Sequence, residues 1–184
     1  IHLHKNIPIG AGLGGGSSDA AFTLMGLNEL FDLKLGISDL KKYALRLGAD
    51  CPFFIENKPC LAKGIGEQLS EVSLNIADVY LLIATPNIHV STAMAYSGVV
   101  PKQPLQPLQK LISEPMADWS MQNDFEDGIF TLEPKIKAIK DKMYDSGALY
   151  SSMSESGSSV FGFFEKEPKV KLEDCRLHLQ EIFF

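Results

Sequence analysis

A glycine-rich segment from Pro8 to Ala21 constrains this chain more than any other part of it. It reads Pro-Ile-Gly-Ala-Gly-Leu-Gly-Gly-Gly-Ser-Ser-Asp-Ala-Ala. Glycine adopts φ angles that are closed to other residues, and its backbone can approach a ligand closely. A helix that starts directly behind such a loop adds unpaired N–H groups and the positive end of its dipole. The segment therefore predicts an anion site of the kind that holds a polyphosphate, with nucleotide-dependent phosphoryl transfer as its chemistry.

Two common glycine-loop classes fit this segment poorly. A Walker A loop requires a lysine after its last glycine, and none is present here, so that class is excluded. The dinucleotide fingerprint G-x-G-x-x-G matches loosely at Gly10, Gly12 and Gly15, but no strand ending in an acidic residue follows about 20 residues later. A flexible linker is the remaining alternative. The predicted strand before the loop and the predicted helix after it argue against a linker.

Length, charge and cysteine content limit the class of protein further. The 184 residues fit one domain, or one domain and part of another, and a net charge of −6 disfavours a nucleic-acid or acidic-membrane surface. No apolar run approaches the roughly 20 residues that span a bilayer, and no signal-peptide pattern opens the chain. The three cysteines are widely spaced and odd in number, which predicts reduced thiols and a cytoplasmic location.

Hydrophobic periodicity predicts alternating helices and short strands along the chain. The predicted helices cover about residues 17–31, 38–47, a short stretch from 91 or 92, and 134–145; the predicted strands cover 1–7, 53–55, a hairpin within 61–69, 79–84, 148–153 and 160–164. The tail 169–184 is ambiguous. Because the chain opens with alternation that is already under way, Ile1-His2-Leu3-His4, we expect it to be a fragment that lacks an N-terminal portion.

The full pattern of the glycine segment resembles the phosphate loop of the GHMP kinases, a family that includes galactokinase, homoserine kinase and mevalonate kinase. Three further segments agree with that family in the same order. They are Leu47–Phe54, which contains Gly-Ala-Asp; Ala62–Glu67, which contains Gly-x-Gly-Glu; and Ser154–Phe161, a second glycine-containing loop. The resemblance therefore covers residues 1 to about 164.

The resemblance implies an α+β fold of the GHMP kinase type. Residues 1–75 would form the remainder of the N-terminal domain, with the phosphate loop and its helices. Residues 76–184 would form the C-terminal domain, an antiparallel sheet with helices. The oligomeric state is not implied.

The resemblance also implies an ATP-dependent kinase that acts on the hydroxyl of a small molecule, with Mg²⁺ accompanying ATP. The Gly-Gly-Gly-Ser-Ser variant of the loop is similar to that of the family members that phosphorylate the 2-hydroxyl of 4-diphosphocytidyl-2-C-methyl-D-erythritol, an isoprenoid precursor. As a fragment, the chain would be weakly active or inactive. The residues expected to bind the ATP phosphates are Gly10, Gly12, Leu13, Gly14, Gly15, Gly16, Ser17 and Ser18.

Asp50 is the expected catalytic residue, because a kinase acting on an alcohol needs a carboxylate to orient the hydroxyl and accept its proton. Without the resemblance, a solvent-facing aspartate at a helix end would be the simpler interpretation. No residue is assigned to the metal, although Ser17 or Ser18 could contact it; capping of the helix is the alternative role for these serines.

Further positions also have expected roles. Thr92 and Tyr96 fall where the resemblance places substrate contacts, with ordinary core packing as the alternative for Tyr96. Helix capping is the preferred interpretation of the segment 123–126, and a solvated turn that of Glu67. Glu155 replaces a glycine of the family pattern, and an anionic side chain beside a triphosphate is unfavourable unless it points away.

Two alternative functions remain open from the sequence. One is a GHMP kinase with another substrate, such as a sugar, homoserine or mevalonate. The other is a nucleotide-binding module without catalysis. Substrate-dependent release of ADP distinguishes all three.

Overall fold

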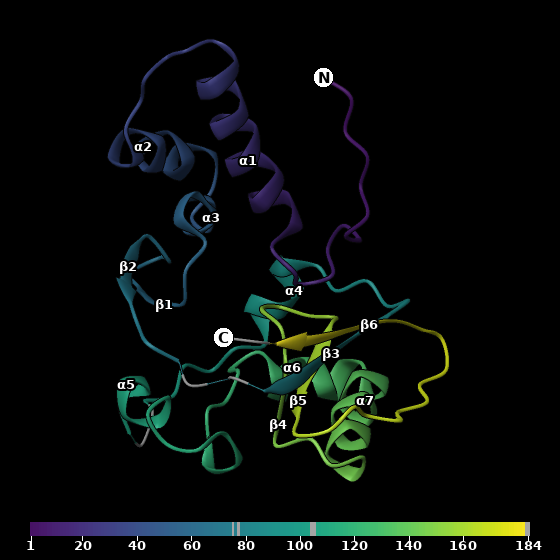
Figure 1. Cartoon of the computed structure of the whole chain (residues 1–184). Coiled ribbons are helices and arrows are strands. Elements are labelled where there is room, and N and C mark those ends of the chain that lie inside the picture. Colours follow the sequence, from purple (N-terminus) through teal and green to yellow (C-terminus); the bar gives the residue numbers. More distant parts are fainter. Residues whose placement is uncertain (75, 77, 104–105, 183–184) are drawn as a thin grey trace. The chain divides into compact units, whose positions relative to one another are not determined.

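The computed structural model describes residues 1–74, 76, 78–103 and 106–182. The chain divides into two compact units, of which one is Gly14–Leu74 and the other joins Ile1–Leu13 to Asn75–Phe184. The division falls inside the glycine segment, between Leu13 and Gly14. Figure 1 shows the order of the elements along the chain.

The larger unit is built on a four-stranded antiparallel sheet with the order β4-β5-β3-β6. Its strands are β3 (Val79–Pro86), β4 (Tyr150–Met153), β5 (Val160–Phe164) and β6 (Cys175–Ile182). The central strand β3 pairs Ile83 with Phe161 of β5 on one side and with His178 of β6 on the other. β3 alternates buried and half-buried residues over its second half, as expected for a strand with one face against a core.

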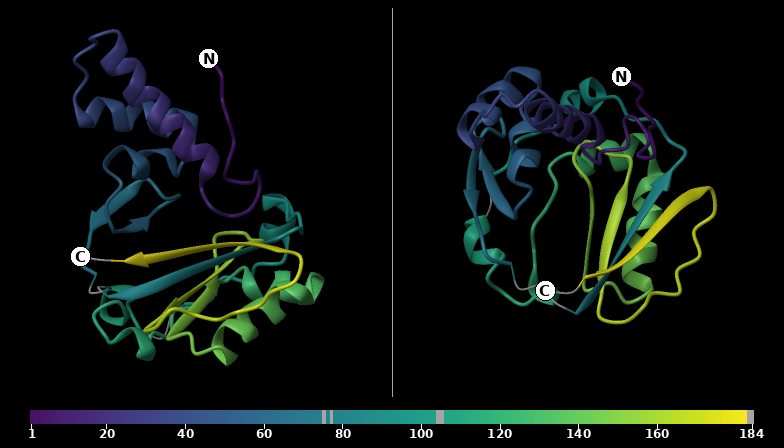
Figure 2. Two further views of the ribbon diagram at one scale, coloured as in Figure 1. Left: turned by 45° about the vertical axis from the view of Figure 1, so that its right-hand side comes forward. Right: turned by 45° about the horizontal axis from the view of Figure 1, so that its top comes forward.

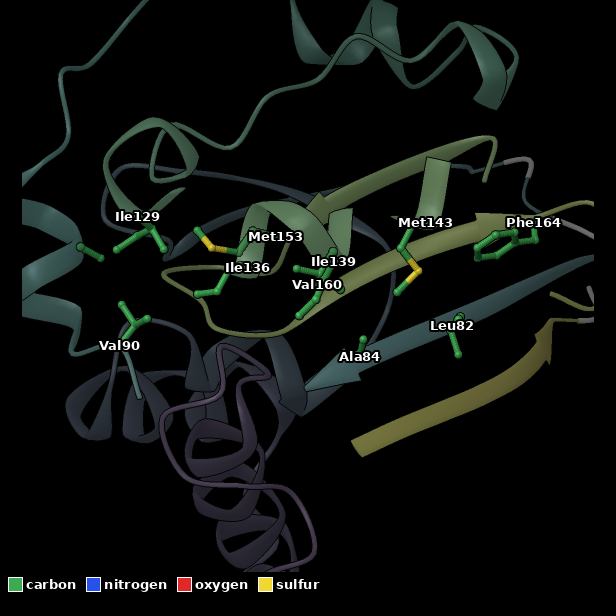
Figure 3. Packing of buried hydrophobic residues seen from close by; sticks show 11 residues of the cluster. Leu82, Ala84, Val90, Ile129, Ile136, Ile139, Met143, Met153, Val160 and Phe164 are labelled. Carbon is green, nitrogen blue, oxygen red and sulfur yellow. The ribbon is translucent and has the colours of Figure 1, made fainter. Parts of the chain in front are cut away.

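The helices of the larger unit are α4 (Thr92–Ser97), α5 (Leu108–Leu111), a 3₁₀ turn (Met116–Asp118), α6 (Glu126–Leu132) and α7 (Pro134–Asp145). Helix α7 lies against one face of the sheet (Figure 2). Met116 of the 3₁₀ turn packs with Tyr150, Phe161 and Phe163 of the other face. Helix α7 buries Ile136, Ile139 and Met143, which recur at helical spacing and pack in one cluster with Leu82 and Phe164 of the sheet (Figure 3). Pro134 occupies the first turn of α7, where its missing N–H has no intrahelical partner to lose.

The smaller unit contains three helices and a hairpin. They are α1 (Gly15–Leu30), α2 (Ile37–Leu47), α3 (Cys51–Glu56), β1 (Cys60–Lys63) and β2 (Gln68–Glu71). Ala21 of α1, Leu40 and Ala44 of α2, and Cys51 and Ile55 of α3 form its buried core. None of the described helices of either unit is long and apolar enough to cross a membrane.

The α+β fold class is confirmed, because the structure combines helices with two antiparallel sheets. The predicted strand at 53–55 is wrong, since these residues belong to helix α3. Pro52 occupies the first turn of α3, where its fixed φ suits a helix. The ambiguous tail contains β6.

The predicted strand at 1–7 is also wrong in the described structure, where these residues form no regular element. Alternation of apolar and polar side chains indicates a strand only when a neighbouring strand pairs with its N–H and C=O groups. Residues 1–7 pair with none of the described strands.

Candidate functional site

The first half of the glycine segment is held in a conformation that only glycine adopts readily. Gly10 and Gly12 have φ angles of 71° and 69°. A β-carbon on Gly12 would lie 2.4 Å from the carbonyl oxygen of Ser154 and 2.8 Å from that of Gly157. Gly12 is therefore required both by its backbone angle and by the backbone that packs against it.

The packing partner of Gly12 is the loop Ser154–Ser159 between β4 and β5, which we call the support loop. The Ser154 N–H donates to the Ser159 carbonyl at 2.9 Å, and the Gly157 N–H donates to the Ser154 carbonyl at 2.9 Å. The Ser159 N–H donates outward, to the carbonyl of Ala11 at 3.0 Å. Since Ala11 is only 4% exposed, this bond fixes the glycine segment to the sheet from a buried position.

The second half of the segment starts helix α1. Gly14 is the N-cap residue, with φ 60°, and no side chain caps the helix. Capping, the alternative role considered for Ser17 and Ser18, is therefore wrong for both. The first turn of α1 carries no acidic residue, so the positive end of the helix dipole has no carboxylate next to it in the first turn.

The first N–H groups of α1 have no carbonyl acceptor within the helix. The Ser18 N–H donates to the Gly14 carbonyl at 2.9 Å, and the N–H groups of Gly15, Gly16 and Ser17 precede the first intrahelical bond. Such N–H groups at a helix start, behind a glycine-rich turn, form an anion-binding site. The residues present therefore fit the phosphate groups of a nucleotide.

Asp50 lies in the smaller unit as the N-cap residue of α3. Its side chain is exposed and makes no capping hydrogen bond. Gly66, in the turn between β1 and β2, approaches it closely, because a β-carbon there would lie 3.4 Å from the Asp50 Oδ1 atom. The carboxylate is thus not used to cap its own helix.

Thr92 and Tyr96 both lie on α4, whose N-cap residue Ser91 accepts a hydrogen bond from the Met94 N–H at 3.2 Å. Both side chains are exposed, and that of Tyr96 is 66% exposed. The Tyr96 ring stands edge-on to that of Phe125, with 5.0 Å between the ring centroids. Core packing of Tyr96 is therefore wrong, and a ligand could reach its outer face.

The segment 123–126 makes tertiary contacts that the sequence did not predict. Helix capping is wrong, since α6 has no side-chain cap. Asn123 instead donates from Nδ2 to the carbonyls of Met153 at 2.8 Å and Glu155 at 2.7 Å. The buried Glu126 accepts from the Met153 N–H at 2.8 Å and pairs with Lys140 at 2.6 Å. The contacts with Met153 and Glu155 join residues 27 to 32 positions apart, so no local pattern could have revealed them.

Glu155 is exposed and has a φ of 48°, in the left-handed region where the family pattern has glycine. Glu67 closes its own turn, as the solvated-turn interpretation expected. Hydrogen bonds from the backbone N–H groups of Glu67 and Ile65, and then from the Gln68 side chain, lower the pKa of its carboxyl. The described residues include no group of three or more His, Cys, Asp or Glu that could hold a metal ion.

Known proteins resemble the chain over most of its length. The family described as GHMP kinases N terminal domain matches residues 1–58, and that described as GHMP kinases C terminal matches residues 101–175. The 4-diphosphocytidyl-2-C-methyl-D-erythritol kinase of Parabacteroides distasonis is 48% identical over 183 residues, which are 96% of this chain and 68% of the relative. The chain belongs to the GHMP kinase family.

Other members of the GHMP kinase family give the same picture. The 4-diphosphocytidyl-2-C-methyl-D-erythritol kinase of Azobacteroides pseudotrichonymphae is 52% identical over 169 residues, 90% of this chain. A crystal structure of 4-(cytidine 5'-diphospho)-2C-methyl-D-erythritol kinase superimposes with a TM-score of 0.73 at 35% identity, over 87% of this chain. The chain spans 63% of the length of the Azobacteroides relative and 59% of the length of the kinase in that crystal structure.

A more distant GHMP kinase shares only the fold. The homoserine kinase of Cytophaga hutchinsonii has a TM-score of 0.63 at 17% identity, over 97% of this chain and 68% of its own. At that identity the similarity concerns the arrangement of helices and strands and carries no argument about substrate.

Proposed function

We propose that the protein transfers the γ-phosphoryl group of ATP to the 2-hydroxyl of 4-diphosphocytidyl-2-C-methyl-D-erythritol, a step of isoprenoid precursor synthesis. The observation that carries the proposal is a glycine segment that leads into the start of helix α1, in a chain 48–52% identical to relatives that bear the name of this kinase. A cytoplasmic location, expected from the three free cysteines, stays a prediction.

In this proposal the residues from Gly10 to Ser18 bind the β- and γ-phosphates through main-chain N–H groups. The positive end of the α1 dipole adds to this binding. Leu13 contributes its N–H, and Ser17 and Ser18 have hydroxyls that no cap uses. Because the N–H groups of the first turn of α1 are held by the helix before ATP arrives, little reorganisation of these groups would accompany the transfer.

Asp50 is the proposed catalytic base. Its carboxylate would accept a hydrogen bond from the 2-hydroxyl and take its proton as the oxygen bonds to the γ-phosphorus and ADP leaves. Mg²⁺ would neutralise phosphate charge during the transfer. Since the described residues offer no ready-made metal cluster, we propose that Mg²⁺ is held mainly by the ATP phosphates.

Tyr96 and Thr92 are the proposed contacts for the cytidine part of the substrate. The exposed Tyr96 ring offers a face for stacking a base, and its edge-on contact with Phe125 fixes the orientation of that face. Both residues lie on one short helix, so a shift of α4 would alter both contacts.

The proposal is tested by ADP release from the full-length protein with the diphosphocytidyl alcohol, homoserine, mevalonate and galactose as separate substrates. We expect turnover with the first alone. Turnover with another alcohol would contradict the substrate, and ATP binding without any turnover would favour a binding module.

The role of Asp50 has its own test. Asp50→Asn should lower kcat by about 100- to 10,000-fold, the range for loss of a general base. The thermal midpoint should not change, because the side chain is exposed and caps nothing. Asp32→Asn is the matched control, since Asp32 is an exposed carboxylate of the same unit that pairs with Lys34. Equal rates for the two variants would show that Asp50 is not the base.

A further inference from the structure

We propose that Asn123 is a positioning residue for the phosphate loop and acts through the support loop, Ser154–Ser159. This inference rests on the proposed function, in which Gly10 to Ser18 hold the ATP phosphates. Asn123 would not touch ATP. It would determine where the backbone that packs against Gly12 lies.

Asn123 connects two carbonyls at the start of the support loop. Its Nδ2 donates to Met153 at 2.8 Å and to Glu155 at 2.7 Å, while its Oδ1 accepts from the Phe125 N–H at 3.0 Å. Both protons of the amide are therefore used, and the acceptor bond sets the side chain's orientation. The two carbonyls lie on either side of Ser154, so Asn123 determines the path of the chain through Ser154.

The Ser154 carbonyl packs closely against Gly12 of the phosphate loop. Its oxygen would lie 2.4 Å from a β-carbon on Gly12, so the two backbones touch with no side chain between them. The Ser159 N–H fixes the other end of the support loop to Ala11 at 3.0 Å. A displacement of Ser154 is transmitted to Gly12 directly, because the two backbones are packed against each other.

Glu126 has a different role in the same region. It accepts from the N–H of Met153, the last residue of β4, and its charge is balanced by Lys140. This contact holds the end of the strand, whereas Asn123 reaches past the strand to Glu155. Loss of Glu126 should therefore destabilise the unit as a whole, and loss of Asn123 should change mainly the support loop.

The test separates phosphate positioning from general stability. Asn123→Ser keeps a short acceptor for the Phe125 N–H but cannot bridge two carbonyls. Asn123→Ala, the second variant, removes the acceptor as well. Asn28→Ser is the matched control, because Asn28 is also half-buried and bonds a backbone N–H and a carbonyl, both of Leu35, in the smaller unit.

Two measurements are made on the full-length protein. The first is the affinity for ATP and for AMP, which lacks the β- and γ-phosphates. Asn123→Ser should weaken ATP binding about tenfold, which corresponds to about 1.4 kcal/mol, and change AMP binding less than about twofold. The second is hydrogen exchange, in which the Ser159 amide and residues 10–13 should exchange faster in Asn123→Ser than in Asn28→Ser.

Each outcome decides a separate point. Unchanged ATP affinity, or equal losses for ATP and AMP, would overturn the positioning role, as would an equal effect of Asn28→Ser. If Asn123→Ser unfolds, Asn123→Ala must unfold too, and the role is then structural and the proposal fails. If the unaltered protein binds no ATP, the proposed function fails, and the exchange of residues 10–13 still decides whether Asn123 holds the loop.

Discussion

The phosphate loop and the turn at Gly64–Glu67 both contain glycines at positive φ. Gly10, Gly12 and Gly14 have φ angles of 71°, 69° and 60°, and Gly64 and Gly66 have 70° and 113°. In the turn, the Ile65 N–H donates to the Glu67 carboxylate at 2.7 Å and the Gly66 N–H donates to the Lys63 carbonyl at 3.1 Å. In the phosphate loop, the N–H groups of Gly15, Gly16 and Ser17 lie at the start of α1 and have no carbonyl acceptor within the helix.

The difference shows what glycine content indicates and what it does not. Positive φ at glycine reports a backbone shape, and both segments have it. A carboxylate from the chain itself already accepts a hydrogen bond in the turn, so an external anion would have to compete with Glu67. Of these two segments, the phosphate loop combines the shape with the start of a 16-residue helix, whose first N–H groups have no carbonyl acceptor within the helix.

The largest effect should come from replacing one glycine with alanine in the phosphate loop, and the turn Gly64–Glu67 provides the comparison. Gly12→Ala should lower the free energy of unfolding by about 2–4 kcal/mol, the sum of a left-handed alanine and an overpacked backbone contact. ATP binding should be lost. Gly64→Ala has a similar φ, but its β-carbon would meet the end of the Glu67 side chain, which can rotate away. We expect a loss of about 1–2 kcal/mol there, from φ alone.

Chemical denaturation and ATP titration measure both variants. Equal losses of stability would mean that Ser154 and Gly157 yield to a side chain as easily as Glu67 does. The phosphate loop would then not be the more rigid of the two turns.

A smaller effect distinguishes the stability of helix α1 from its proposed role in phosphate binding. Gly16 and Gly26 both lie in α1 with nothing within 4 Å of an added β-carbon. Alanine at either position should raise the free energy of unfolding by about 0.5–1 kcal/mol, because glycine is the weaker helix former. Gly16→Ala should also weaken ATP binding, since its new methyl group would lie in the proposed phosphate site, whereas Gly26→Ala should not. Thermal melts and ATP titration of the pair would contradict the proposed site if both variants bound ATP equally well.

Local sequence patterns predicted the helices and strands whose buried residues recur at regular spacing or in one continuous run. The apolar stripe of α7 and the continuous apolar run of β3 identified both elements, and the family resemblance identified the fold. The predicted strand at 53–55 failed because an apolar triplet suits a strand or a buried helix turn equally well, and Pro52 permits the helix.

The candidate site was predictable only where backbone shape is encoded in residue type. The glycines at positions 10, 12 and 14 predicted the backbone shape of the loop, because glycine readily adopts positive φ. Asn123 and Glu126 act through contacts with residues near position 153, which depend on tertiary packing. The family resemblance drew attention to that segment, but capping was the wrong physical role for it.

The smallest effect is a pH dependence of stability, which Glu67 gives to the turn Gly64–Glu67. Hydrogen bonds to the Glu67 carboxylate lower its pKa below the usual 4.5, so the folded turn favours the ionised form. The contribution of Glu67 to stability is therefore present above pH 4.5 and is lost as the pH falls through the lowered pKa. NMR of the Ile65 amide should show a titration with its midpoint below 4.5, and Glu67→Gln should abolish it. A titration of the Ile65 amide that persists in Glu67→Gln would contradict the assignment of this pH dependence to Glu67.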